Sequence, residues 1–282
     1  MLTYMAAQQK KAEQFYQLHH TGKLFILPNI WDVLGVKLLE SLDYKAIATA
    51  SASIAYSNGF DDGENIPFEN VLSTLKNIVN STSLPVTADI ESCYANDEIQ
   101  LEKNIKQIIA TGIVGINIED SNHSNHTLNS IEIQCNRIKL IKRVAKEMNV
   151  SLFINARTDV LLYNNLFSTS EVKLSELMKR GLAYKEAGAN CFFPIALRNV
   201  EDIEALVNGL KMPINILALP GIPDFTILDK LGVARVSLGP GLLKYAIKAM
   251  KSLATELKEY NGLSLITENE ITSNYLKSLI HH

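Results

Sequence analysis

The sequence has few cysteines, and none of their spacings marks a structural framework. Cys93, Cys135 and Cys191 are odd in number, widely separated and without a CxxC pair. This pattern gives no support to a disulfide-stapled secreted domain or to a cysteine-rich zinc site. We therefore expect three reduced cysteines and a cytoplasmic location.

Long apolar runs and a large excess of one charge are also missing. No run approaches the roughly 18–20 apolar residues that span a bilayer, and the first residues, MLTYMAAQQKKAEQF, contain no apolar signal core. The formal net charge is −3, which gives no electrostatic basis for binding nucleic acid or an anionic membrane. We expect partners of neither kind.

Three common motifs of nucleotide-binding proteins and hydrolases are absent: GxGxxG, GxxxxGK[ST] and GxSxG. Their absence argues against a dinucleotide-binding doubly wound sheet, a P-loop and the nucleophile elbow of a serine hydrolase. The 282 residues are 47% hydrophobic, which is enough to bury a large core. On length alone they fit one eight-unit barrel or two small domains, but no linker or shift in composition divides the chain.

Eight short apolar runs recur along the chain, each followed by an amphipathic stretch. They are rich in β-branched or aromatic residues and end in polar or glycine-rich sequence, as buried parallel strands do. The runs are 25–30, 46–50, 85–90, 114–118, 151–156, 191–196, 214–219 and 234–238.

Helical spacing of apolar residues marks the stretches 68–79, 131–148 and 171–187, and Gly188 suits a helix C-terminus. Eight strand–helix units over ~250 residues predict a (β/α)8 TIM barrel of the α/β class. We interpret 1–282 as a single domain, with the barrel core at about 25–260 and a helical tail at about 261–282.

Acidic residues follow three of the predicted strands. Asp89 and Glu91 come directly after the strand at 85–90 and are two apart, so an extended backbone points both to one side. Glu119 ends the next strand, and Asp62 lies in the loop after the second strand. These carboxylates predict a site for Mg²⁺, with Mn²⁺ as an alternative. The competing interpretation is that they only cap the helices that follow.

Arg157 lies at the end of the fifth predicted strand, in the segment Asn155-Ala156-Arg157-Thr158-Asp159. An arginine is costly to bury unless it meets an anion, and its planar fork suits a carboxylate, phosphate or phosphonate. An internal salt bridge to Asp159 or Glu119 is the alternative, and both interpretations can hold together.

Two further groups are weaker candidates. His123 and His126 lie in a polar loop, where histidines are usually solvated, and no cysteine or third histidine completes a zinc set. Cys93, two residues beyond Glu91, fits a small packing residue at a strand end better than a nucleophile.

Over roughly residues 25–260 the chain resembles the isocitrate lyase/phosphoenolpyruvate mutase superfamily. The resemblance rests on the order and spacing of five segments. They are PNIWDVLGVKLLESLDYKAIATAS (28–51), PVTADIES (85–92), GINIEDS (115–121), INARTDV (154–160) and LALPGIPDFTILDKLGVARVSLGPGLL (217–243).

The resemblance implies roles for particular residues. Asp89 would be the principal metal ligand, Glu91 and Glu119 would bind directly or through water, and Asp62 would be an outer ligand. Arg157 would hold the carboxylate or phosphonate of the substrate. The backbone amides of Ser51 and Ala52 would bind another substrate oxygen, and Asn129 would belong to the substrate-binding Asn-Ser pair of the mutase branch.

The resemblance also implies a reaction and an assembly. Members cleave or form a bond next to a pyruvate-like carbonyl through an enolate held on the metal. The implied function is that of a lyase or phosphonomutase-like enzyme acting on a small dianionic 2-oxo or 2-hydroxy carboxylate or phosphonate, with decarboxylation as a further possibility. Such enzymes form homotetramers or dimers of dimers, often with an exchanged C-terminal helix, for which 242–260 is the candidate.

The chain departs from the superfamily in the loop after Glu119. That loop, DSNHSNHTLNS, lacks both the KKCGH of the lyases and the lysines of the mutases, and Ser92 and Cys93 replace glycines that usually follow the acidic strand. His123 or His126 is a candidate acid–base residue on closure of this loop. A barrel that binds a metabolite without turnover is the alternative function.

Overall fold

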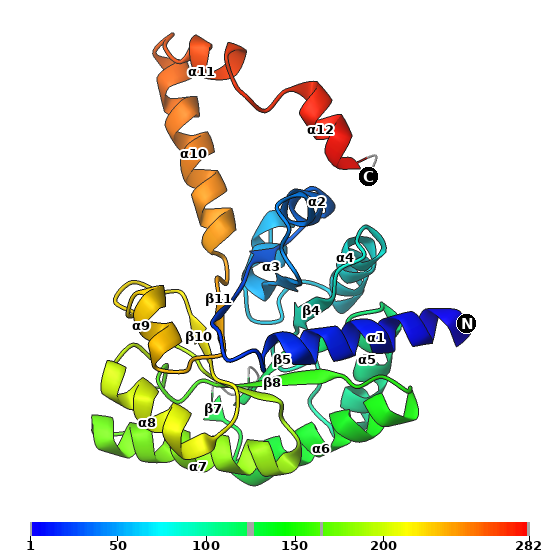
Figure 1. The fold of residues 1–282 in the computed structure, drawn as a ribbon, viewed down its shortest axis with the longest axis vertical. Helices are drawn as coiled ribbons and strands as arrows, with labels where there is room; N and C mark the ends of the chain where they lie inside the picture. Colours follow the sequence, from blue (N-terminus) through cyan, green and yellow to red (C-terminus); the bar gives the residue numbers. More distant parts are fainter. Residues whose placement is uncertain (1, 123–126, 164–165, 281–282) are drawn as a thin grey trace.

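Parallel strands form a ring surrounded by helices in the computed structural model, which describes residues 2–122, 127–163 and 166–280, with the backbone alone for residues 2–5 (Figure 1). The strands are β1 (Phe25–Leu27), β2 (Asn29–Ile30), β3 (Ile47–Thr49), β4 (Val86–Asp89), β5 (Gly115–Glu119), β8 (Phe153–Thr158), β9 (Cys191–Pro194), β10 (Asn215–Leu217) and β11 (Arg235–Ser237). Each predicted apolar run overlaps one of them, except that the first run holds both β1 and β2, which are interrupted at Pro28.

The strand order closes the ring. One sheet runs β2-β3-β4-β5-β8-β9 and a second runs β1-β11-β10, with parallel pairing throughout. They meet where β1 continues into β2 and at a parallel bridge between Phe192 and Ile214. The (β/α)8 barrel predicted from the sequence is therefore confirmed.

Helices follow the strands at the predicted places. The first predicted stretch is α4 (Phe68–Asn80), the second α6 (Ile131–Glu147) and the third α7 (Ser170–Ala187). Gly188 ends α7 with φ 108°, a left-handed value that glycine adopts without strain. The other barrel helices are α2 (Val33–Ser41), α3 (Ser51–Ser57), α5 (Glu98–Ala110), α8 (Val200–Leu210) and α9 (Phe225–Lys230).

The N-terminal helix α1 (Leu2–Leu18) packs against the ends at which the strands begin (Figure 1). Phe15 is fully buried and contacts Phe25 and Phe153 edge to face, while Gln8 donates to one carbonyl in the last turn of α5 and to one just before β5. Because one mouth of the barrel is filled in this way, substrate access is left to the opposite mouth, where the strands end.

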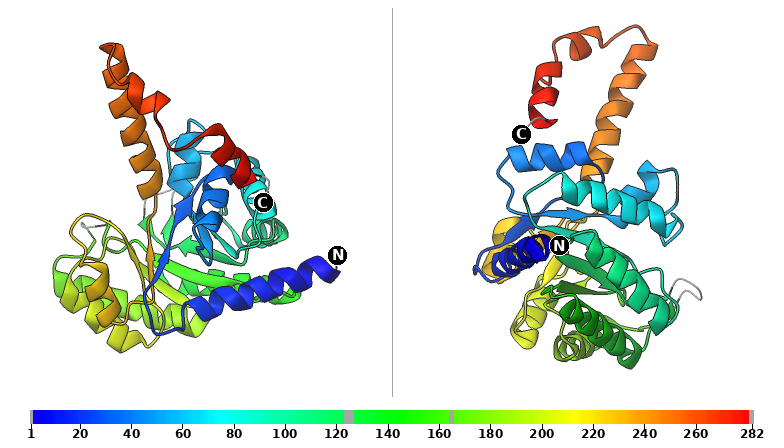
Figure 2. Two further views of the ribbon diagram at one scale, coloured as in Figure 1. Left: turned by 45° about the horizontal axis from the view of Figure 1, so that its top comes forward. Right: turned by 90° about the vertical axis from the view of Figure 1, so that its right-hand side faces the viewer.

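The C-terminal helices leave the barrel. Helix α10 (Gly241–Lys258) projects away from the ring, and α11 (Leu263–Thr267) leads to α12 (Ser273–Ile280), which returns to pack on α2 (Figure 2). No residue of α10 is buried, whereas Leu279 of α12 is. Among the described residues, no helix combines the length and apolarity needed to cross a bilayer.

Candidate metal and substrate site

A pocket of about 200 Å³ opens where β4, β5 and β8 end. Its walls come from strand ends and from the loops that follow α3 and β8, so residues distant in the sequence meet at one edge of the barrel, as the fold requires. The lining residues are Ser51, Asp62, Gly63, Glu91, Glu119, Ser121, Arg157, Asp159, Leu162 and Tyr163.

Asp89 ends β4 beside this pocket and is bound to the start of α3. Its Oδ2 accepts hydrogen bonds from the backbone N–H of Ser51 at 3.4 Å and from the Ser51 hydroxyl at 3.2 Å. Its Oδ1 is buried with no hydrogen-bond partner among the described residues. A buried carboxylate oxygen without a partner is costly, and a cation is one ligand that would satisfy it.

Glu91 is placed by a sharp turn that the sequence did not predict. The expectation of an extended backbone from Asp89 to Glu91 is wrong, because β4 ends at Asp89 and Glu91 has φ 53°. Cys93 and Tyr94 are left-handed as well, with φ 67° and 52°. This conformation costs a non-glycine residue roughly 1–2 kcal/mol, which explains why glycine is usual in this segment. The side chain of Glu91 nevertheless reaches the pocket, and only 3% of the residue is exposed.

Arg157 is held by two carboxylates. Its Nη1 lies 2.6 Å from Glu119 Oε2, while its Nε and Nη2 donate to the two carboxylate oxygens of Asp159 at 2.6 and 2.9 Å. Ser121 donates to Asp159 at 2.6 Å. The internal salt bridge considered from the sequence is thus present with both acids. Although burial opposes its charge, Glu119 and Asp159 hold the pKa of Arg157 above its ordinary value.

Asp120, next to Glu119, belongs to the framework instead of the pocket. It is fully buried, and its carboxylate accepts hydrogen bonds from Arg180, the Tyr184 hydroxyl and the backbone N–H of Asp159. This network ties the end of β5 to α7 and to the residue that orients Arg157. The sequence indicated no role for Arg180, and for Asp159 it indicated only a salt bridge. The different surroundings of Glu119 and Asp120 follow from the alternation of side chains along an extended strand.

The other predicted site residues are distributed less compactly. Asp61 and Asp62 are both exposed, but only Asp62 is among the residues that line the pocket. Ala52 is half-buried on α3 and is not among the lining residues. Asn129 lines an adjoining polar recess of about 170 Å³, and its backbone bonds to Asp120 and Arg180. The ligand roles of all these residues stay predictions.

The segment that carries His123 and His126 lies outside the described residues. It connects β6 (Ser121–Asn122) to β7 (Thr127–Leu128), which pair as a short antiparallel ribbon. Because Ser121 lines the pocket, this ribbon starts at the pocket wall. The three cysteines are free, and burial raises the pKa of the fully buried Cys93 thiol. Packing is therefore the role that the structure supports for Cys93.

The electrostatics of the pocket suit a divalent cation. Burial, followed by the charges of Asp62 and Glu119, raises the pKa of Glu91 to about 8. Burial also raises the pKa of Asp89, with Arg157 offsetting part of the effect. Oxygen ligands that repel one another fit Mg²⁺ or Mn²⁺. Within the described ranges, however, no three His, Cys, Asp or Glu side chains stand close enough to form a ready-made metal cage.

The alternative interpretation of the strand-end acids was that they only cap the helices that follow their strands. The N-cap of α5 is Asp97, and that of α6 is Ser130. Asp89, Glu91 and Glu119 are therefore not the N-caps of the helices that follow their strands, and the capping interpretation is wrong.

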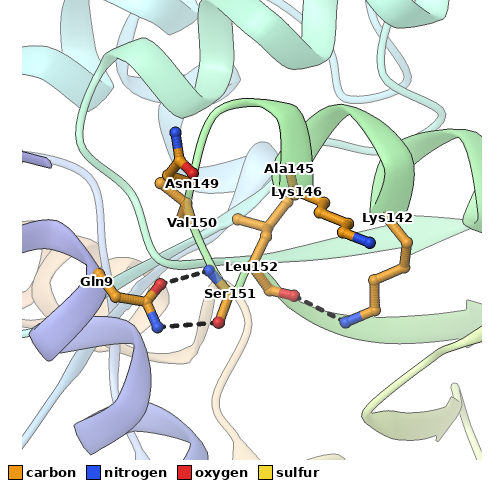
Figure 3. A pocket seen from close by; sticks show the side chains of 8 residues that line it. All are labelled: Gln9, Lys142, Ala145, Lys146, Asn149, Val150, Ser151 and Leu152. Atoms are coloured by element: carbon orange, nitrogen blue, oxygen red, sulfur yellow. Dashed lines mark hydrogen bonds between the residues drawn. The ribbon is translucent and has the colours of Figure 1, made fainter.

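A larger hollow of about 550 Å³ lies at the opposite mouth, between α1, α6 and the start of β8 (Figure 3). Gln9 bonds to Ser151 there, and Lys142 donates to the carbonyl of Leu152. The lining includes Lys146 but no carboxylate, so of these two cavities the smaller one has the acidic ligands that the expected metal ion needs.

Comparison with known proteins identifies the family of this chain. The sequence model of phosphoenolpyruvate phosphomutase matches residues 15–258. An uncharacterized protein of Mycobacterium tuberculosis H37Rv is 31% identical over 231 residues, which are 80% of this chain and 81% of the relative. The 2-methylisocitrate lyase of Halalkalibacterium halodurans is 24% identical over 264 residues, or 90% of this chain and 84% of that enzyme.

A solved structure supports the fold. The crystal structure of phosphonopyruvate hydrolase in complex with oxalate and Mg²⁺ superimposes with a TM-score of 0.82 at 20% sequence identity, covering 95% of this chain and 94% of that chain. At this identity the likeness shows a shared barrel fold, and the sequence matches supply the family. The chain belongs to the phosphoenolpyruvate phosphomutase family, within the isocitrate lyase/phosphoenolpyruvate mutase superfamily.

Proposed function

We propose that this chain is a Mg²⁺-dependent lyase or phosphonomutase-like enzyme that makes or breaks a C–C or P–C bond next to a pyruvate-like carbonyl. Its substrate is a small 2-oxo or 2-hydroxy carboxylate or phosphonate. The observation that carries the proposal is the meeting of Asp62, Glu91 and Glu119 with Arg157 in one pocket of about 200 Å³. A volume of this size suits a small acid, and the relatives carry the names of a lyase and a hydrolase of such acids.

Arg157 retains donors for a substrate anion. A guanidinium has five N–H groups, of which described residues use three: two bind Asp159 and one binds Glu119. One N–H remains on Nη1 and one on Nη2. Either can donate a charge-assisted hydrogen bond to a carboxylate or phosphonate, while Asp159 fixes the plane of the guanidinium.

The acidic wall would hold the metal ion. Glu91 and Glu119 line the pocket, Asp62 faces it from the loop after α3, and Asp89 beside it has a buried oxygen without a partner among the described residues. When bound, Mg²⁺ supplies Lewis acidity that stabilises negative charge developing on the carbonyl oxygen of the substrate. Arg157, which is paired with Glu119 of this wall, would bind the anionic group of the substrate and so orient it in the pocket.

A proton-transfer group is expected on the segment between β6 and β7. His123 and His126 belong to this segment in the sequence, and Ser121, which precedes it, lines the pocket. Replacing both histidines should lower kcat with little change in metal affinity, as expected of a group that moves protons without binding the ion. An unchanged kcat would reject this role.

The function can be tested by measuring pyruvate or enolate release from oxaloacetate, dimethylmalate-type acids and phosphonopyruvate, with and without Mg²⁺. We expect turnover only with the metal. Asp62→Asn should raise the Mg²⁺ requirement about tenfold, whereas Asp61→Asn is a matched control because Asp61 is exposed and outside the pocket. Absence of metal-dependent turnover across the panel would favour a barrel that binds a metabolite without converting it.

A further inference from the structure

Glu64 joins two segments that form the acidic wall of the pocket. It lies in the loop between α3 and α4, two residues after Asp62, and it is itself left-handed with φ 62°. Its backbone N–H donates to Glu91 Oε2 at 2.8 Å. Its side-chain Oε1 accepts from the backbone N–H of Tyr94 at 2.6 Å and from the Ser92 hydroxyl at 2.7 Å.

Two helices hold the same turn from its carbonyl side. Arg137 of α6 donates from Nη2 to the carbonyl of Ser92 and from Nη1 to that of Ala95 at 3.2 Å. Asn104 of α5 donates from Nδ2 to the carbonyls of Cys93 and Tyr94, at 2.8 and 3.0 Å. Both donors are buried. The turn therefore has fixed supports on α5 and α6, and Glu64 is the contact that connects it to the loop of Asp62.

We propose that Glu64 is a positioning residue, which sets Glu91 and Asp62 at the separation that the metal ion requires. The inference rests on the proposed function, because it assumes that these two acids face the ion. Glu64 does not line the pocket of Asp62 and Glu91, so it acts through its neighbours. One residue orients the Glu91 carboxylate with its backbone and anchors the left-handed turn with its side chain.

The geometry separates this role from that of general packing. Loss of the Glu64 side chain leaves the supports from Arg137 and Asn104 in place, so the turn keeps its attachment to the barrel. What is lost is the link between the turn and the loop of Asp62. Metal affinity should therefore fall more than stability does, as happens when residues that orient metal ligands are removed.

The experiment measures Mn²⁺ affinity by electron paramagnetic resonance, and Mg²⁺ affinity by competition, in the full chain and in single variants. Glu64→Ala should weaken both affinities about 10- to 100-fold. Glu64→Gln should stay near the original protein, because its amide oxygen can still accept from Ser92 and Tyr94. Glu69→Ala is the matched control, since Glu69 is an exposed acid at the start of α4.

The outcomes are distinct. Mn²⁺ binding by Glu64→Ala that equals that of the unchanged protein would overturn the inference and leave the proposed function standing. No Mn²⁺ binding by the unchanged protein would overturn the proposed function itself, and the inference with it. If Glu64→Ala does not fold, Glu64→Asp provides the test: its shorter side chain cannot bridge both donors, and an unaltered affinity in that variant would equally overturn the positioning role.

Discussion

At the scale of single residues, we expect Arg157 to bind the anionic group of the substrate, because its guanidinium lines the pocket beside Glu119. Lysine at this position would keep the charge that Glu119 and Asp159 need but would lose the planar fork. We expect Arg157→Lys to weaken oxalate binding in the presence of Mg²⁺ by about 10- to 150-fold, which corresponds to one charge-assisted hydrogen bond of about 1.5–3 kcal/mol. Isothermal titration calorimetry measures this change.

The control for this substitution is Arg143→Lys. Arg143 lies on the exposed side of α6, where it pairs with Glu102 and Glu147, and solvent-exposed pairs contribute little. Equal oxalate affinity in Arg157→Lys and Arg143→Lys would show that the guanidinium does not bind the anion.

Residue by residue, the chemistry of the site is more predictable from the sequence than its supports are. Glu91, Glu119 and Arg157 could be predicted to share a pocket because charged side chains at or just beyond the ends of apolar strands need a reason to be there. The turn at Glu91 was not predictable, because three non-glycine residues in left-handed conformations give no local signal. Its supports come from other helices, and only the folded chain brings them to it.

At the scale of elements, α1 carries a group that should make stability depend on pH. His19, the first residue after this helix, stacks on Phe153 with ring centroids 4.2 Å apart and bonds through Nδ1 to the carbonyl of Phe15 in the last turn of the helix. Burial, then the positive charge of Arg235, lowers its pKa to about 3. Because this lies below the value of about 6.5 for an unfolded histidine, the unfolded chain binds the additional proton between these pH values.

Protonation of His19 should therefore destabilise the folded protein. The contribution of His19 is fully present above about pH 6.5 and is lost as the pH falls toward 3, at about 1.4 kcal/mol per pH unit. Between pH 6.5 and 5 the folded protein should lose about 2 kcal/mol through this group. His19→Phe should remove that slope from the unfolding free energy measured by chemical denaturation. His20→Phe, at the exposed neighbouring position, should keep it, and an identical slope in both variants would contradict the assignment.

The elements themselves were largely predictable from the sequence. Strands buried on both sides are continuous apolar runs, so their positions in a parallel barrel can be recognised in the sequence alone. The role of α1 was not predictable, because an amphipathic N-terminal stretch does not say which mouth of the barrel it fills. The β6–β7 ribbon also escaped prediction, since its two-residue strands, Ser121–Asn122 and Thr127–Leu128, are too short and too polar to show an apolar pattern.

At the scale of the whole molecule, α10 presents an apolar stripe with no partner among the described residues of its own chain. Ile247 and Met250 are 50% and 57% exposed, and no residue of the helix is buried. Apolar residues at Leu243, Ile247, Met250 and Leu257 repeat at intervals compatible with helix–helix packing. An exposed stripe of this kind on a projecting helix marks an interaction surface.

We propose that a second copy of the chain covers this stripe, in the homotetramer or dimer of dimers expected from the sequence resemblance. Replacing Ile247 and Met250 together by glutamate would place charges in the packed seam, which is strongly unfavourable when they are desolvated. Light scattering after size-exclusion chromatography should show an assembly for the unchanged protein and a lower mass for the double variant.

Lys248→Glu alters the same helix outside the stripe and should leave the mass unchanged. A monomeric unchanged protein, or a double variant of unchanged mass, would show that α10 does not form the contact. Because Ile247 and Met250 are exposed in the single chain, the double variant should retain its barrel fold, and circular dichroism would distinguish lost assembly from lost folding.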